Sequence, residues 1–144
     1  MPNPTIPITS DVMIDGGQPT ANFNTAGCCG VRLHYISGTK TERLRSLLYV
    51  AIPPEIAVAE IYKAELRLFW WNITGTAAAT LYRVTQEAWT EAGATWNKYD
   101  GVTNWTLEGG DYDTTEKVQF TVPAVVGWQE IDITTWLIDI INNH

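Results

Sequence analysis

Acidic side chains are the residues of this sequence most able to do chemistry, because paired carboxylates can act as general acid and base. Glu87, Glu91 and Glu108 lie among tryptophans, as the acids of sugar-cleaving enzymes do. Such a pair needs one desolvated member, and sixteen Asp and Glu in 144 residues supply neighbouring acids by chance. The sequence also contains no nucleophile-elbow, zinc-protease, phosphate-loop or dinucleotide-binding motif. We therefore expect no enzymatic activity.

A glycine-rich stretch carries acids that suit a metal ion better than catalysis. Glu108, Asp111 and Asp113 surround two adjacent glycines, and Asp100 precedes them. Hard carboxylate oxygens in such a loop are ligands that Ca²⁺ prefers. The regular spacing of a helix–loop–helix calcium site is absent, so solvated turn acids are the alternative interpretation. Calcium is the one cofactor that the sequence suggests.

Aromatic residues give the same stretch a second possible role, the binding of sugars. Tryptophan and tyrosine rings stack on sugar rings, while Asp and Asn bind hydroxyl groups. The candidate glycan-binding residues are Trp105, Tyr99, Asp100 and Asn104. Tryptophans in a long loop more often hold that loop in place, and we expect this of Trp89 and Trp96. Trp105 lies farthest into the Gly-, Asp- and Asn-rich part, so we expect it to be the one reachable from solvent.

Alternating apolar residues predict a series of short strands. These segments are residues 11–14, 31–37, 43–50, 64–71, 76–84, 116–122 and 128–133. Residues after 133 could extend a sheet or form one or two helical turns. The alternation predicts that Leu47, Tyr49, Leu66, Leu68, Leu81, Val118, Phe120, Ile131 and Ile133 point inward. We expect an all-β fold, a single-domain antiparallel jelly-roll-like β-sandwich at residues 10–144, behind an extended arm at residues 1–9 whose prolines disfavour packed structure.

Several short motifs occur in an order found in a known family. They include Tyr82-Arg83-Val84, Trp89-Thr90-Glu91, Thr95-Trp96-Asn97, Gly109-Gly110-Asp111 and Gly127-Trp128. In this order the chain resembles the DNRLRE-type domain family, which is related to carbohydrate-binding jelly-roll modules. The resemblance implies a non-catalytic domain of a kind found in polysaccharide-degrading enzymes and in structural and viral proteins. Family members usually continue into a closing strand, which this sequence lacks, and we expect an open sheet edge.

Charge and hydropathy limit the partners. The net charge of −7 argues against nucleic acid, whose phosphates are bound by Lys and Arg. No run of eighteen apolar residues is present, which predicts no membrane span, and the N-terminus shows no signal peptide. We expect a virion or an extracellular surface as the location.

Two features predict assembly with other copies of the chain or with a lattice such as a capsid. Ile6 and Ile8 share one face of the extended arm and could add to the open edge of another copy. Cys28 and Cys29 are adjacent and do not bridge each other without strain, so they are either free thiols or bonds between copies.

Two functions follow from these observations. The main interpretation is a homo-oligomeric, non-catalytic structural protein of a virion surface, such as a capsid decoration or a tail component. The alternative is a carbohydrate-binding module of a polysaccharide-degrading system, which takes a polysaccharide as its partner.

Overall fold

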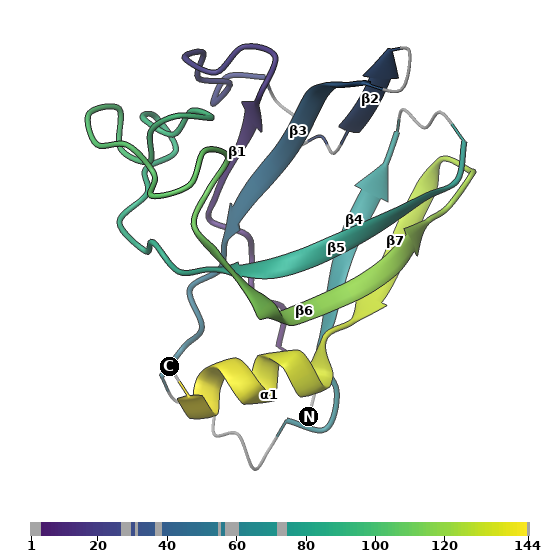
Figure 1. The fold of residues 1–144 in the computed structure, drawn as a ribbon. Coiled ribbons are helices and arrows are strands. Elements are labelled where there is room, and N and C mark those ends of the chain that lie inside the picture. The colour runs from purple at the N-terminus through teal and green to yellow at the C-terminus, as the bar shows by residue number, and fades with distance from the viewer. Residues whose placement is uncertain are drawn as a thin grey trace. The chain divides into compact units, whose positions relative to one another are not determined.

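The fold is that of a computed structural model that describes residues 4–26, 30, 32–36, 39–54, 56, 61–71 and 75–143, with the backbone alone for residues 32–36 and 39–42. Antiparallel strands make up most of it, with one helix (Figure 1). The predicted all-β class is therefore confirmed. The chain falls into two compact units, one of Met1–Ile52 with Val84–Tyr112 and one of Pro53–Arg83 with Asp113–His144, and each is described by itself.

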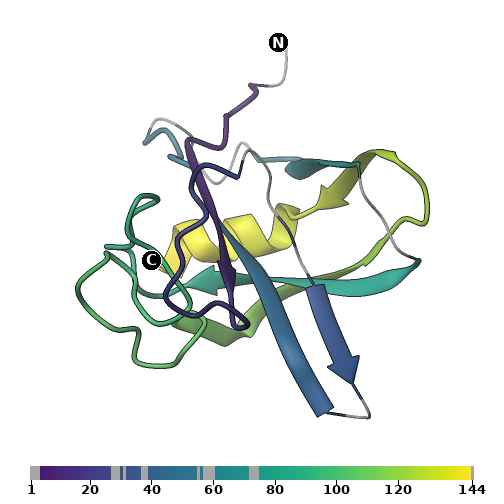
Figure 2. The ribbon, with the colours of Figure 1, turned by 90° about the horizontal axis from the view of Figure 1, so that it is seen from above.

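The first unit contains a three-stranded antiparallel sheet. Its order is β1 (Ser10–Asp15), β3 (Thr39–Tyr49) and β2 (Arg32–Ile36), and Figure 2 shows β2 and β3 side by side. The predicted strands 11–14, 31–37 and 43–50 are all present, although β3 begins four residues earlier than its alternation indicated. The difference arises because β3 continues to pair with β2 up to Ile36 and Thr39, beyond the part that shows apolar alternation.

The core of this unit forms where the long segment of residues 85–111 packs on β1 and β3. Its buried members are Val12, Ile14, Leu47, Ala94, Trp96 and Trp105, with Val84, Trp89 and Tyr99 packed against them. Leu47 is buried as predicted. Tyr49 was wrongly predicted to be inside and is 49% exposed. Tyr49 is the last residue of β3 and pairs with Ser10, so no apolar side chain of β1 stands opposite to cover it.

Trp96 is a buried side chain of this core that the backbone of Gly109 approaches closely. The backbone N–H of Gly109 donates to the Trp96 carbonyl at 2.7 Å, and the Gly109 backbone has φ of +86°. A Cβ atom added at Gly109 would lie 2.6 Å from Cζ2 of the indole. The Arg45 guanidinium lies 5.0 Å from the Trp96 ring centroid and donates through Nη1 to the Gly109 carbonyl at 2.6 Å. Gly109 thus needs to be glycine for both its conformation and its contact.

The second unit contains two strand pairs and a helix. β4 (Glu65–Trp70) pairs antiparallel with β7 (Gly127–Asp132), and β5 (Ala77–Val84) pairs with β6 (Tyr112–Val122). The four predicted strands here are present, and β6 begins four residues before the expected 116. The sequence did not predict this first part of β6, because the polar residues Asp113–Glu116 show no apolar alternation.

Predicted interior residues of this unit are shielded to different degrees. Ile131 is buried, and the partly buried ones are Leu66, Leu68, Leu81, Val118, Phe120 and Ile133. Trp70, on the Leu66 and Leu68 side of β4, lies 6.4 Å from the Phe120 ring and donates from Nε1 to Gln129 Oε1 at 2.9 Å. That side of β4 and β7 is therefore the packed side of the strand pair.

A helix, α1 (Thr134–Asn143), follows β7 and settles the alternatives left open for the C-terminal segment. The Asp132 carboxylate accepts from the backbone N–H and the hydroxyl of Thr134 at 2.9 and 2.7 Å, a turn that starts the helix. These bonds lower the pKa of Asp132, with the Thr134 hydroxyl as the main cause. Within α1, Asn143 donates from Nδ2 to the Asp139 carbonyl at 2.9 Å.

The N-terminal arm is described from residue 4 onward and has no regular secondary structure before β1. It joins the first unit through Thr9, whose N–H donates to the Tyr49 carbonyl at 2.9 Å. Ile6 is partly buried and Ile8 is 37% exposed. Cys28 and Cys29 lie outside the described residues.

We predict that Gly109→Ala destabilises the protein far more than Gly110→Ala. Both glycines have positive φ, +86° and +107°, so alanine at either position costs about 1–2 kcal/mol of backbone energy. Only at Gly109 does the new methyl meet the Trp96 ring, which adds an overpacking cost of about 1–3 kcal/mol. Thermal unfolding followed by tryptophan fluorescence measures both variants. Equal melting temperatures for the two variants would contradict the role given to the Gly109–Trp96 contact.

Candidate functional site

Trp105, the residue expected to be the most reachable from solvent, is buried. It is 5% exposed, and its indole N–H donates to the Thr95 carbonyl at 2.9 Å. The ring therefore has no open face to offer a sugar, and the prediction of its exposure is wrong. Its position in a polar stretch was misleading because the segment folds back on itself. The backbone N–H of Trp105 donates to the Asn97 carbonyl at 3.0 Å, and this contact brings the indole into the core.

The neighbouring candidates mostly hold the same loop together. Tyr99 packs against Trp105 with ring centroids 5.6 Å apart. The Asp100 carboxylate accepts from the backbone N–H groups of Val102 and Thr103, which lowers the pKa of Asp100, with the Thr103 N–H as the main cause. Asn104 is exposed and forms an isolated bridge with Lys98. Glycan binding by these residues stays a prediction, and only Asn104 presents its side chain mainly to solvent.

The two aspartates expected to bind calcium, Asp111 and Asp113, are engaged in separate turns. The two oxygens of Asp111 accept from the N–H groups of Thr106 and Leu107 at 3.0 and 2.8 Å. Glu108 is exposed. Among the residues that the structure describes, no three His, Cys, Asp or Glu side chains gather closely enough to hold a metal ion. Calcium binding by Asp111, Asp113 and Glu108 therefore stays a prediction without a three-ligand group behind it.

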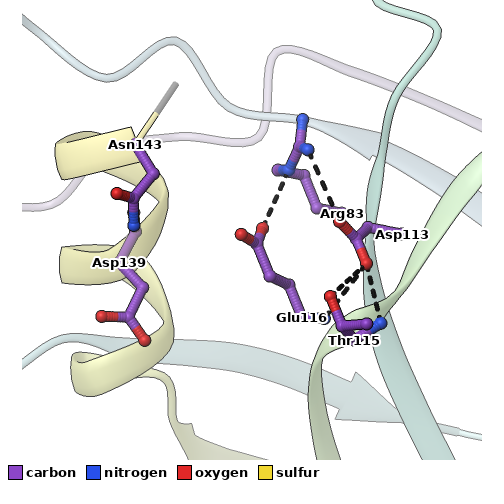
Figure 3. Close-up of polar contacts among 6 residues, drawn as sticks. All are labelled: Arg83, Asp113, Thr115, Glu116, Asp139 and Asn143. Atoms are coloured by element: carbon purple, nitrogen blue, oxygen red, sulfur yellow. Dashed lines mark hydrogen bonds and ion pairs between the residues drawn. The ribbon is translucent and has the colours of Figure 1, made fainter.

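Asp113 belongs instead to an ion cluster in the second unit (Figure 3). Its Oδ1 accepts from the N–H and the hydroxyl of Thr115 at 2.7 and 2.6 Å, and its Oδ2 lies 3.9 Å from Nη2 of Arg83. Arg83 also donates through Nε to Glu116 at 2.9 Å, and its side chain is only 17% exposed. Since Arg83 lies on β5 and both acids on β6, the cluster ties the two strands together.

β4 and β7 together present one face on which every side chain is exposed. The face of this strand pair opposite Leu66 and Leu68, here called the outer face, carries only exposed side chains: Glu65, Arg67 and Phe69 on β4, with Trp128, Glu130 and Asp132 on β7. Residues directly opposite each other in an antiparallel pair share a face, so Phe69 stands against Trp128 and Arg67 against Glu130. The outer face thus combines an aromatic pair with charged groups.

The aromatic pair of the outer face is open to solvent. Trp128 is 65% exposed and Phe69 50% exposed, and their ring centroids are 5.3 Å apart at an interplanar angle of 64°. The Arg67 guanidinium lies over the Trp128 ring at 5.2 Å and pairs through Nε with Glu130 Oε1 at 3.2 Å. Arg67 thus holds both neighbours in place while much of the indole remains uncovered.

The sequence contained a signal for this surface that the strand assignment did not use. The alternation that places Leu66 and Leu68 inside also places Arg67 and Phe69 outside. On β7 the same alternation places Trp128 on one face of the strand and Ile131 on the other. Two exposed aromatic residues on neighbouring strands are uncommon without a binding role, since monomeric proteins rarely expose large apolar patches.

Two open hollows also occur, one within each unit. One, of about 400 Å³, lies in the first unit and is lined by Thr85, Gln86, Thr106, Leu107, Asp111 and Tyr112. The other, about 370 Å³, lies in the second unit between β6 and α1, with Lys117, Trp136 and Asp139 among its lining residues. Neither gathers a set of groups with evident chemistry, and the outer face remains the strongest candidate site.

Comparison with known families decides the class of protein. The family model described as Carbohydrate-binding module family 96 matches residues 3–143. The chain belongs to this family. No curated protein and no solved structure matches it. Membership of Carbohydrate-binding module family 96 supports the expected relation to carbohydrate-binding modules, whereas the narrower DNRLRE-type assignment stays a prediction.

Membership of this family also distinguishes between the two functions expected from the sequence. A carbohydrate-binding module family is non-catalytic and suggests a polysaccharide partner, so it favours the alternative interpretation over the main one. It lends no support to a virion surface, a capsid lattice or a homo-oligomer. In the part of the chain that the structure describes, no helix has the length and apolar character needed to span a membrane.

We predict that replacing a buried tryptophan costs much more stability than replacing an exposed one. Trp105→Ala removes a buried indole and its hydrogen bond to Thr95 and should cost about 3–5 kcal/mol of unfolding free energy. Trp128→Ala removes a mostly exposed ring and should cost about 1 kcal/mol or less. Urea denaturation of both variants measures the difference. A Trp128→Ala variant that is the less stable of the two would contradict the assignment.

We predict that Asp113 contributes to acid unfolding. Its pKa is lowered chiefly by the Thr115 hydroxyl, and then by the Thr115 N–H, so the folded state keeps the carboxylate ionised at a pH where the unfolded chain, with a pKa of about 3.9, is protonated. The stability from this difference is present above about pH 4 and is lost as the pH falls through the lowered pKa. Asp113→Asn should therefore flatten the fall in melting temperature below pH 4.

The matched control for this measurement is Asp139→Asn. Among the described residues the Asp139 carboxylate accepts no hydrogen bond, although its backbone carbonyl does. Its replacement should leave the acid part of the melting-temperature profile parallel to that of the wild type. An Asp113→Asn profile that is also parallel to the wild type would show that the Thr115 bonds do not act as described.

Proposed function

We propose that this protein is a non-catalytic carbohydrate-binding module that holds a polysaccharide chain on the outer face of β4 and β7. The observation that carries the proposal is the exposed pair of Phe69 and Trp128 on a strand face that is otherwise charged. Family membership supports a glycan as the ligand. An extracellular surface is the location that suits such a ligand.

Stacking supplies the main attraction in this proposal. The face of an aromatic ring is electron-rich and apolar, and the C–H face of a sugar packs on it. Trp128 offers the larger exposed area. The Phe69 ring is inclined at 64° to the Trp128 ring, so the two rings do not form one flat stacking surface. A sugar unit stacked on Trp128 would therefore be restricted in its orientation by Phe69.

Polar groups around the aromatic pair would fix the hydroxyl groups of the same sugar. The Arg67 guanidinium has more N–H donors than its bond to Glu130 uses, and it lies against the Trp128 ring. The Glu130 carboxylate likewise has lone pairs beyond that bond. Sugar hydroxyls both donate and accept, so they match this pair of neighbours.

The acids of the outer face give no support for hydrolysis of the bound glycan. A general acid needs a raised pKa, usually from burial. Glu130 is 53% exposed and paired with Arg67, and Asp132 has a lowered pKa. Binding without cleavage is therefore the function that these side chains favour.

We predict that Trp128→Ala abolishes polysaccharide binding without unfolding the protein. Aromatic residues at the centre of a binding surface contribute about 2 kcal/mol or more, which corresponds to a loss of affinity of at least about thirtyfold. Affinity electrophoresis in gels that contain soluble polysaccharides, β-glucans, mannans, xylans and polyuronates, measures the retardation of each variant. Thermal unfolding confirms that the variant is folded.

The matched control is Tyr62→Ala, which removes an aromatic side chain of the same unit that is 91% exposed and lies outside β4 and β7. It should keep the retardation of the wild type. If Tyr62→Ala lost binding and Trp128→Ala retained it, the outer face would not be the binding site. If the wild type were retarded by no polysaccharide, the proposed function would fail.

A further inference from the structure

We infer that the binding surface continues past the end of β4 to Trp71, which holds a second sugar unit of the same glycan chain. The inference rests on the proposed function, because it adds a stacking position to the outer face. It follows from exposed apolar side chains at one end of this face that a single sugar on Trp128 does not use.

The outer face has a charged end and an apolar end. One end carries its four charged residues, which are Glu65, Arg67, Glu130 and Asp132. Phe69 and Trp128 come next along the strand pair, and the ladder ends with Trp70 opposite Gly127. The residues one step beyond this last pair are Trp71 and Val126. Apolar side chains at this end are therefore not limited to the aromatic pair.

Trp71 is the exposed aromatic residue that follows β4. It is 60% exposed, and none of the described residues forms a hydrogen bond or a ring contact with its indole. The preceding residue, Trp70, points to the packed side, where it contacts Phe120 and Gln129. Successive side chains of an extended chain point to opposite sides, so Trp71 lies on the same side as Phe69.

Two valines enlarge the apolar end. Val125 and Val126, in the turn that leads into β7, are 69% and 62% exposed. They bring the large apolar residues that are at least half exposed at this end to five, together with Phe69, Trp71 and Trp128. Monomeric proteins rarely expose large apolar patches without a binding role, so the whole of this end needs an occupant.

A continuing glycan chain is the occupant that these residues fit. Residues two apart on a strand are separated by about 6–7 Å, which is comparable to the length of one sugar unit in a chain. A unit stacked on Trp128 beside Phe69 therefore places its neighbour at Trp71, whose ring offers a second stacking surface. The glycan chain then runs parallel to β4 at this end of the outer face.

Trp71→Ala tests the inference with ligands of two lengths. Single sugars and six-unit oligosaccharides of the gluco-, manno-, xylo- and uronate series compete with the matching polysaccharide in affinity gels. For the series that binds the wild type, Trp71→Ala should lower the affinity for the six-unit ligand about tenfold and that for the single sugar less than about twofold, because a single sugar uses Trp128. Trp71→Tyr keeps a stacking ring and should retain most of the six-unit affinity.

Tyr62→Ala is the matched control, because it removes an exposed aromatic side chain of the same unit that precedes β4. It should bind both ligands as the wild type does, and thermal unfolding verifies that each variant is folded. An equal loss for the single sugar and the six-unit ligand in Trp71→Ala would overturn the inference. The absence of any loss in that variant would overturn it as well.

A second copy of the chain is the competing occupant of the apolar end. Sedimentation velocity of the wild type and of Trp71→Ala distinguishes it from a glycan. We expect both proteins to sediment as the same species. A wild-type dimer that Trp71→Ala dissociates, with glycan binding unchanged, would show that the apolar end is an interface between copies and would overturn the inference.

Trp128→Ala separates the failure of this inference from the failure of the proposed function. If Trp128→Ala abolishes binding of the six-unit ligand and Trp71→Ala leaves it unchanged, the outer face is the site and only the second stacking position is overturned. If the wild type binds a glycan and Trp128→Ala has no effect, the proposed function is overturned and the inference with it. A wild type that binds no ligand of any series overturns both.

Discussion

The close approach of the Gly109 backbone to the Trp96 indole is the contact on which the first unit depends. Gly109 reaches the ring because it has no Cβ, and its N–H closes on the Trp96 carbonyl at 2.7 Å. Arg45 of β3 donates to the Gly109 carbonyl and lies over the same ring, and its guanidinium is also 5.0 Å from the Tyr112 ring centroid. One indole thus connects the sheet to the long segment that follows β5, and that connection determines where Trp105 is buried.

Tryptophan serves two opposite purposes in this protein, and the surroundings of each ring decide which one. Trp96 and Trp105 lie where the backbone folds back on itself and provides a carbonyl for the Trp105 N–H. Trp128 lies on a strand face that none of the described residues of its own unit covers, beside a cation and an aromatic edge. A buried indole stabilises a loop, whereas an exposed one offers surface to a ligand.

The three aspartates that looked suitable for metal binding or sugar binding instead hold turns together. Asp100, Asp111 and Asp113 each accept hydrogen bonds from N–H groups two to five residues away in the chain, and Asp132 does the same at the start of α1. These bonds lower the pKa of Asp100, Asp113 and Asp132, which favours a structural use of these carboxylates over acid catalysis. This explains why an acidic chain with many candidate residues points to binding rather than to a reaction.

Period-2 alternation determined the strand class of this chain and the packed sides of β4 and β7, because side chains of a strand point alternately to its two faces. The same alternation also indicated which residues of β4 form the outer face, since residues that alternate with Leu66 and Leu68 must point the other way. Only the tertiary structure decided that Trp105 is buried and that Tyr49 is exposed. Burial depends on what lies across the chain from a residue, Thr95 and Asn97 for the one and Ser10 for the other, and spacing along the sequence does not contain that information.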